Sequence, residues 1–305
     1  MAGMYRGYCE QSRMIGLLAA MIQESPSPMS QFPLFVHLKQ GLNSSNLRKA
    51  LQDIRDGWRH RNLWGTMGLQ DIKQRYRRSV IGPFWLTISM GVMVGALGLV
   101  WGMIFKQQMD NYLPYLCAGF VLWALISSLI LEGTTAFTSG EGMIKQLTAP
   151  LSVHVYRIVW SNFIIFLHNI WILFIVLLWY GKNPGWVALL SLPAVGLLLM
   201  NGVWVGLLFG LLSARFRDIP QIIASVVQVT FFLTPIIWRP DMLPERALVL
   251  ELNPFYYALK IVRDPLIGIA PTAHDWLMML LITAAGWALA LLFYTVYRWR
   301  LAYWL

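Results

Sequence analysis

Charged residues are scarce in this chain, and their scarcity excludes a soluble globular protein. Only 12% of the 305 residues are Asp, Glu, Lys or Arg, whereas soluble domains carry about 25%. Hydrophobic residues make up 57%, and there are 15 Trp. A soluble chain of this length could not bury so much apolar surface in one core. The surrounding solvent must therefore be lipid.

The sequence also lacks the motifs of many enzymes and metal proteins. It has no G-x-x-x-x-G-K-[ST] phosphate loop and no H-E-x-x-H, C-x-x-C or G-x-S-x-G motif. Cys9 and Cys117 have no metal-ligand spacing, and Cys117 lies in an apolar run, so no disulfide framework is implied. We therefore expect a chain that binds no cofactor or metal and is not itself an enzyme.

Long charge-free windows are what the sequence does contain. Because a helix crosses a bilayer with about 20 apolar residues, each of six windows could span it. These windows are 79–105, 113–131, 158–181, 183–214, 219–238 and 276–297. The sequence therefore predicts an all-α integral membrane protein with six transmembrane helices. Its predicted parts are a basic cytoplasmic extension (1–60), an amphipathic interface helix (61–80) and a six-span domain (81–300).

The distribution of basic residues favours an orientation with both termini in the cytoplasm. Most Lys and Arg then lie on the inner side, while those on the outer side are balanced by acids. The net charge of +10 is thus first a topology signal, and no nucleic-acid partner is expected. A competing feature is "MIGLLAAMI" (14–22), which resembles a signal-peptide core. Cleavage at this segment would place the basic residues up to Arg78 on the outer side of the membrane, which contradicts the charge distribution.

The stretch "DIKQRYRRSVIGPFW" combines a basic cluster with a turn into the first apolar window. At 100° per residue, four apolar side chains share one stripe, as expected of a helix lying in the membrane surface: Leu69, Ile72, Tyr76 and Val80. Gly82-Pro83 then lets the chain turn, because Pro is tolerated in the first turn of a new helix. Near an anionic surface each basic residue contributes about 1 kcal/mol of attraction.

Two loops and one acid are further candidates. The segment "TSGEGMIKQLTAPLSVHVYR" between windows two and three is long enough to form a small docking element. After window five, five Pro divide an apolar stretch into pieces too short to cross, which predicts short re-entrant helices on the outer side. Glu132 is the acid nearest a membrane interior, where acids are functional candidates; a place at the lipid–water boundary is the alternative.

Small residues repeat every three or four positions in windows one and four. Such repeats permit close helix contact, either within one subunit or along a dimer seam. The glycines concerned are Gly91, Gly95, Gly98 and Gly102 in the first window and Gly202, Gly206 and Gly210 in the fourth.

Taken in order, these features resemble the membrane subunit of ABC-2 type polysaccharide exporters, which move O-antigen, capsule or teichoic acid chains. The resemblance rests on "DIKQRYRRSVIGPFW", the six windows, "GEGMIKQLTAP", "RFRD" (215–218), and "NP" (253–254) followed by Arg263, and covers about residues 62–300.

The resemblance implies a homodimer in the bacterial inner membrane that works with two copies of a separate ATPase, which uses ATP and Mg. The predicted ATPase-coupling segment consists of Glu141, Gly142, Met143, Ile144, Lys145, Gln146 and Leu147. The short outer helices would form an external gate containing Asn253, Pro254, Phe255, Tyr256, Tyr257 and Arg263.

The substrate of such an exporter is a lipid-linked polysaccharide, and its anionic head suggests basic ligands. Arg can bind phosphate in bidentate fashion, so the predicted head-group residues are Lys73, Arg75, Arg77 and Arg78. Alternatively, these charges only anchor the helix to membrane lipids. A sliding polymer suits broad aromatic faces. The predicted conduit residues, which could instead form interfacial belts, are Phe84, Trp85, Trp101, Phe231, Phe232 and Trp238.

Two other functions remain open. An ABC-2 exporter of a drug or small lipid would share this architecture, and the sequence discriminates against it only weakly. A membrane-embedded transferase acting on lipid-linked sugars would need an acidic pair or a positioned base, and the loops show only isolated acids.

Overall fold

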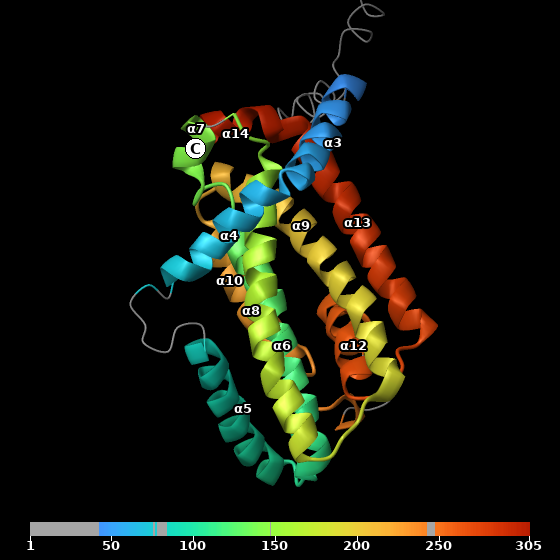
Figure 1. Cartoon of the computed structure of the whole chain (residues 1–305). Coiled ribbons are helices and arrows are strands. Elements are labelled where there is room, and N and C mark those ends of the chain that lie inside the picture. The colour runs from blue at the N-terminus through green and yellow to red at the C-terminus, as the bar shows by residue number, and fades with distance from the viewer. Residues whose placement is uncertain (1–42, 76, 78–83, 147, 243–247) are drawn as a thin grey trace, which may run out of the picture.

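The computed structural model describes residues 43–75, 77, 84–146, 148–242 and 248–305. Every regular element in this described part is a helix (Figure 1). Long helices run along a bundle, and α3, α7 and α14 gather at one end of it (Figure 1), which we call the α7 end. The all-α prediction is confirmed.

Within the residues that the structure describes, five helices are long and apolar enough to cross a membrane. They are α5 (Phe84–Ile104), α6 (Met109–Thr134), α8 (Ser152–Trp179), α9 (Ser191–Arg215) with the preceding η2 (Gly185–Leu190), and α13 (Ala273–Tyr297), which continues through η4 (Arg298–Arg300) into α14 (Leu301–Trp304). They correspond to five of the six predicted windows. The chain is therefore a multi-pass membrane protein.

The remaining window, 219–238, forms a shorter helix than predicted. Helix α10 (Ile219–Leu233) has 15 residues, about 22 Å of helix, whereas the hydrocarbon core is about 30 Å thick. It ends where Thr234 becomes extended (φ −95, ψ 136). Pro235 follows, and a residue before Pro is disfavoured in helical conformation. Charge counting had missed this break because Thr and Pro are uncharged.

Short helices follow α10, as the Pro-rich stretch predicted. They are η3 (Pro240–Met242), α11 (Leu248–Glu251) and α12 (Pro254–Leu266). Helix α12 packs between α6, α9 and α13 in the bundle. Its side chains from Tyr257 to Leu266 are nearly all buried, so it forms part of the core. Whether it re-enters the membrane from the outer side stays a prediction.

The centre of the bundle is α6, which contacts α5, α8, α9, α10 and α12. Its backbone approaches α9 closely, because a Cβ added at Gly133 would lie 3.2 Å from the Cα of Gly206. A Cβ at Gly210 would lie 3.1 Å from the Gly133 carbonyl oxygen. On α5, Gly98 meets Leu113 of α6 in the same way. The repeated glycines of α9 and Gly98 of α5 therefore pack within the subunit, whereas a Cβ at Gly95 of α5 would meet no described atom within 4 Å.

The sequence did not predict α3 (Ser44–Arg59), which packs on α8 and α13. Its buried Asp53 accepts a hydrogen bond from the Leu151 amide at 2.9 Å and one from the Tyr294 hydroxyl at 2.8 Å. The Ser152 hydroxyl donates to the Asp53 carbonyl oxygen at 2.7 Å. These bonds join α3 to the start of α8 and the end of α13.

Helix α4 (Arg61–Arg75) covers most of the predicted interface helix. The predicted boundary at residue 60 coincides with the break between α3 and α4. Ile72 is buried and Leu69 is exposed, while Tyr76 and Val80 lie outside the described residues. Gly68 lies so close to α8 that an added Cβ would be 3.1 Å from the Arg157 carbonyl oxygen. Helix α4 thus packs on the bundle along one side.

Candidate functional site

A polar cluster joins α4, α6 and α8 at the α7 end of the bundle. Arg75 of α4 donates from Nη2 to Glu132 Oε1 of α6 at 2.8 Å. Asn162 of α8 donates from Nδ2 to the other oxygen, Glu132 Oε2, also at 2.8 Å. Both carboxylate oxygens of Glu132 are therefore used, and an acid in the last two turns of a membrane helix is neutralised by a specific partner.

A second ion pair lies beside the first. Asp71 of α4 accepts two hydrogen bonds from Arg157 of α8, one from Nε and one from Nη2. This is the bidentate arrangement that guanidinium and carboxylate prefer. Since Asp71 and Arg75 are four residues apart on α4, the two pairs occupy adjacent turns and hold α4 against the bundle.

The two ion pairs line a cavity of about 460 Å³, which we call the polar cavity. Its other lining residues are Ile72, Gln74, Thr135, Ala136, Ser139, His154, Ile158, Ser161 and Ile165. His154 is only 4% exposed, and its Nδ1 has no hydrogen-bond partner among the described residues. Buried polar atoms are rarely left unpaired, so this nitrogen is a candidate for contact with water or a ligand.

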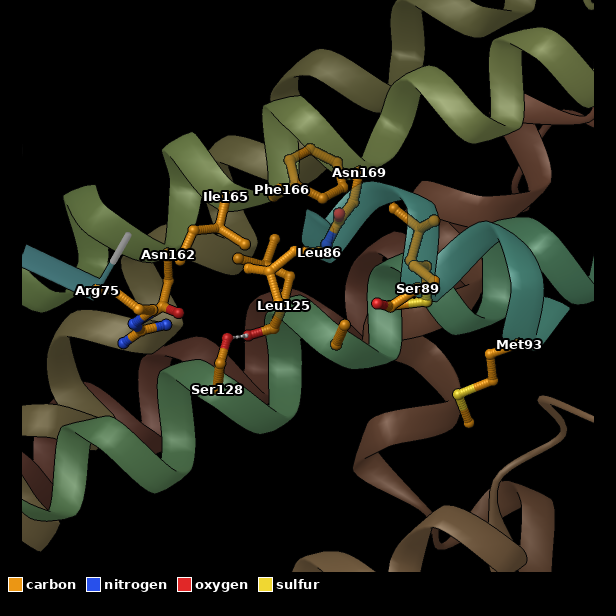
Figure 2. A pocket seen from close by; sticks show the side chains of 13 residues that line it. Arg75, Leu86, Ser89, Met93, Leu125, Ser128, Asn162, Ile165, Phe166 and Asn169 are labelled. Carbon is orange, nitrogen blue, oxygen red and sulfur yellow. Dashed lines mark hydrogen bonds between the residues drawn. The ribbon is translucent and has the colours of Figure 1, made fainter. Parts of the chain in front are cut away.

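An adjoining cavity of about 310 Å³, the apolar cavity, extends between α5, α6 and α8. Figure 2 shows Arg75 at one end of it and Met93 at the other, with Asn162, Phe166 and Asn169 on α8 between them. Asn169 is 5% exposed, and its Oδ1 lacks a hydrogen-bond partner within the described part of the chain. Arg75 and Ile165 line both cavities, so the two spaces meet at the Arg75–Glu132 pair.

The four predicted head-group residues do not form one cluster in the described structure. Arg75 pairs with Glu132, whereas Lys73 and Arg77 have exposed side chains and do not line the two cavities. Arg78 lies outside the described residues. A helix distributes neighbouring residues around its axis at about 100° intervals, which explains why a run of basic letters does not become one basic patch.

The six predicted conduit aromatics lie in different surroundings. Phe84, Trp85 and Phe232 are exposed on the surface of the chain, and Trp101 is half-buried against Phe105. Phe231 instead packs on Phe120 and Trp123 of α6, with ring centroids 5.7 and 5.8 Å apart. The half-buried Trp238 donates from its indole nitrogen to the Phe232 carbonyl at 3.0 Å. The exposed members remain available to a partner, a substrate or lipid.

The predicted coupling segment forms the short helix α7 (Glu141–Gln146), and Leu147 lies outside the described residues. None of the six helical residues is buried, and a Cβ at Gly142 would meet no atom of the described residues within 4 Å. Lys145 pairs with Glu141 at 2.6 Å, and the hydrogen bond and charge of Lys145 lower the pKa of Glu141. Helix α7 is thus a short, exposed and charged helix at the end of the bundle (Figure 1).

Two of the predicted gate residues, Asn253 and Arg263, contact the segment in which α10 ends. Arg263 of α12 is 2% exposed and donates from Nη1 to the Pro235 carbonyl at 2.7 Å. Its guanidinium lies 4.1 Å from the ring centroid of Tyr115, whose hydroxyl donates to the same carbonyl at 2.9 Å. Carbonyls freed by a helix break in an apolar environment need such partners.

The other gate residues belong to the start of α12. Asn253 caps the helix by accepting from the Phe255 amide at 3.0 Å, and its Nδ2 donates to Thr234 Oγ1 at 3.0 Å. Pro254 occupies the first turn, where its missing N–H is tolerated. Tyr256 and Tyr257 pack edge to face, with centroids 5.4 Å apart. These contacts are structural, and gating by this region stays a prediction.

Sequence reasoning missed Asp71, His154, Arg157 and Asn162 as members of the cluster. Arg157 was assigned to a loop because charge-free windows were taken as spans, yet α8 begins at Ser152 and includes it. The sequence offered one signal: Asp71 and Arg157 each lie a few residues away from an apolar run. Pairing across 86 residues cannot be deduced from such a signal.

The five long apolar helices in the described part of the chain define a multi-pass membrane protein. The chain belongs to the ABC-2 type transporter family, whose model matches residues 62–267. It is similar to two proteins of Klebsiella pneumoniae, both described as O-antigen export system permease protein RfbA. One is 26% identical over 198 residues, 64% of this chain and 76% of the relative. The other is 25% identical over 188 residues, 61% and 72% of the two chains.

Proposed function

We propose that this chain is the membrane-spanning subunit of an exporter that moves a lipid-linked polysaccharide across the bacterial inner membrane. The observation that supports this most is the similarity to O-antigen export permeases over about three quarters of their length. A homodimer would form the path, and ATP hydrolysis with Mg would occur on two copies of a separate ABC ATPase. Both chain termini would be cytoplasmic.

Helix α7 is the proposed contact with the ATPase. Its exposed, charged surface suits a cleft on a soluble partner, because it contains a self-paired Glu141 and Lys145 and no buried side chain. Its base is tied to the bundle, since a Cβ at Gly140 would lie 2.5 Å from Nδ1 of His154. A push on α7 would therefore reach α8 directly.

For the substrate we propose a head-group contact at Arg75, which is the one of the three described basic residues of this set that lines both cavities. Lys73 and Arg77 would attract anionic head groups to the membrane surface from their exposed positions. The exposed Phe84, Trp85 and Phe232 would then face the polymer, because broad aromatic contact permits sliding.

The function is tested by deleting the chromosomal gene and measuring surface polysaccharide and its lipid-linked precursor. Deletion should remove polymer from the surface and accumulate it inside, and a plasmid copy should restore export. Co-purification should recover an ABC ATPase with the chain. Unchanged surface polysaccharide in the deletion strain would contradict the proposal.

A second function, export of a drug or small lipid, has one structural observation in its favour. A cavity of about 260 Å³ lies between α6, α9, α10, α12 and α13, and its lining side chains are almost all apolar. Its volume is just below the range of about 300–1,000 Å³ typical of small-molecule sites. Increased sensitivity of the deletion strain to apolar toxins, with normal surface polysaccharide, would favour this alternative.

A further inference from the structure

We propose that the polar and apolar cavities form one binding site for an amphiphile whose head carries both a phosphate and hydroxyl groups. The head would occupy the polar cavity between α4, α6 and α8, and the chain would occupy the apolar cavity between α5, α6 and α8. The inference rests on the proposed function for the origin of the ligand, a glycan attached to a lipid phosphate, and it assigns that ligand a place within a single subunit.

The adjacency of the two cavities is the first support. Arg75 and Ile165 line both, and Arg75 pairs with Glu132, which in turn accepts a hydrogen bond from Asn162. Figure 2 shows Arg75 and Asn162 at the same end of the apolar cavity. From Asn162 to Asn169 the apolar cavity follows about 10 Å of α8. It therefore leads from the charged cluster toward the middle of a 28-residue helix, which is the direction expected of a lipid chain whose head remains at the membrane surface.

The side chains of the polar cavity indicate the chemistry of the head. Two guanidinium groups, Arg75 and Arg157, face it, and each is already neutralised by a carboxylate. Because the charges cancel, a bare anion gains little there. A ligand with phosphate oxygens for the guanidinium groups and hydroxyls for Asp71 and Glu132 would satisfy both kinds of partner. A sugar phosphate has this combination.

Unpaired polar atoms on residues that line the two cavities are the second, independent support. The two atoms are Nδ1 of His154, a residue that lines the polar cavity, and Oδ1 of Asn169, a residue that lines the apolar one. The His154 nitrogen lies next to Gly140. Both residues are more than nine-tenths buried, and neither atom has a hydrogen-bond partner among the residues that the structure describes. Burial without a partner is unfavourable, so both positions call for a ligand group or a water molecule.

The apolar cavity has the lining expected around a flexible chain. Met90 and Met93 of α5, Leu125 of α6 and Phe166 of α8 all line it. Methionine adapts its shape to irregular partners more readily than branched side chains do. Helix α5 is also the least buried of the five long helices, with 17% of its most apolar window buried, so the chain can enter beside it from the bilayer.

Photolabelling of the ATPase-containing complex in nanodiscs tests this site. Three probes share a long saturated chain with a diazirine near its end and differ in the head: a sugar phosphate, a plain phosphate and a neutral sugar. Labelled residues are identified by mass spectrometry. The sugar-phosphate probe should label Met90, Met93 or Phe166 about tenfold more than the neutral sugar does, which corresponds to about 1.4 kcal/mol, and more than the plain phosphate does.

Two variants separate the head from the chain. The double variant Asp71→Asn/Arg157→Gln keeps the polar cavity neutral and should remove the preference for sugar phosphate while the neutral probe labels as before. Arg55→Gln, a change of an exposed basic residue on α3 that lines neither cavity, should change nothing. Equal labelling by all heads, an unaffected double variant, or labelling confined to Phe231 and Phe232 would each overturn the proposal.

Free phosphate is a distinct source of the same chemistry. If inorganic phosphate displaces the sugar-phosphate probe as effectively as an unlabelled copy of that probe does, the site binds free phosphate and the amphiphile proposal fails. Failure of the proposed function would look different: these labels would appear in a chain whose deletion leaves surface polysaccharide unchanged. If the polysaccharide is exported but these residues are not labelled, the proposed binding site is wrong and the proposed function is unaffected.

Discussion

Helices α5 and α6 are almost equally apolar, with mean hydropathies of 1.8 and 2.0, yet their burial differs fourfold. In α6, 72% of the most apolar window is buried, and in α5 only 17%. Hydropathy therefore reports that a helix lies in lipid, but not whether its neighbours are lipid or protein. The difference divides the subunit into a central block built on α6 and a peripheral helix that contacts it along one side.

The largest expected effect comes from paired tryptophan variants. Trp123 of α6 is 7% exposed and packs on Phe231 and Phe255, whereas Trp85 of α5 is exposed. Trp123→Ala should lower the free energy of unfolding by about 3–5 kcal/mol because it leaves a cavity. Trp85→Ala should change it by less than about 0.5 kcal/mol. Thermal unfolding in detergent measures both, and equal losses would contradict the division.

Glycine variants test the same division through overpacking. A Cβ at Gly206 would lie 2.7 Å from Cγ1 of Val155, so Gly206→Val should cost about 1–3 kcal/mol of stability. At Gly95 of α5 an added Cβ meets no described atom within 4 Å. Gly95→Val should therefore leave unfolding unchanged. Size-exclusion profiles and thermal midpoints are the measurements, and a destabilised Gly95 variant would show that α5 has a neighbour within the purified assembly.

Acids at the two ends of α6 sharpen the comparison within one helix. Glu132→Ala removes the partner of Arg75 and Asn162, but the pair is partly exposed, so the loss of stability should be only about 1 kcal/mol. Export should nevertheless fall severalfold, because Arg75 would no longer be held where the two cavities meet. Asp110→Ala, which removes a 3.6 Å contact with Lys182, is the matched control. Equal export by the two variants would remove the role of Glu132.

The smallest effect concerns pH and the helices outside the long spans. Burial raises the pKa of Asp53 in α3, against opposing hydrogen bonds and the charge of Arg298. The folded state then binds the proton more tightly, so the stability of α3 should fall as pH rises from the ordinary carboxyl range through the raised value. For Glu141 in α7 the hydrogen bond from Lys145 lowers the pKa, so its stabilisation should be lost as pH falls through the lowered value.

Hydrogen-exchange protection factors of α3 and α7, corrected for intrinsic exchange, should therefore change in opposite directions with pH. Asp53→Asn should flatten the trend of α3 and leave that of α7 unchanged. Parallel trends in the two helices would show that a global effect, rather than these two carboxyls, determines the response.

The fold was predictable where one physical variable sufficed. Absence of charge located five spans, and Pro spacing predicted the short helices after α10. Counting charges failed at Thr234-Pro235, where the backbone conformation and not a charged residue ends the helix. Composition also failed at α3. Its many polar residues suggested a cytoplasmic extension outside the bundle, whereas Asp53 and Ala50 are buried and α3 packs on α8 and α13.

The site was less predictable because it depends on distant pairs. Arg75 and Glu132 were each singled out for a local reason, but nothing local indicates that they meet across 57 residues. Nor does anything local indicate that Arg157 and Asp71, which were not singled out at all, meet across 86 residues. Glycine repeats allowed packing within one subunit or between two, and only the position of α6 relative to α9 distinguishes them.

The contact between Gly140 and His154 has a consequence for timing. The imidazole forms a wall of the polar cavity on one side and abuts the root of α7 on the other. In the proposed exporter, a substrate head group in that cavity and an ATPase bound to α7 would act on this one side chain, so the ATPase would respond to the presence of substrate before it hydrolyses ATP.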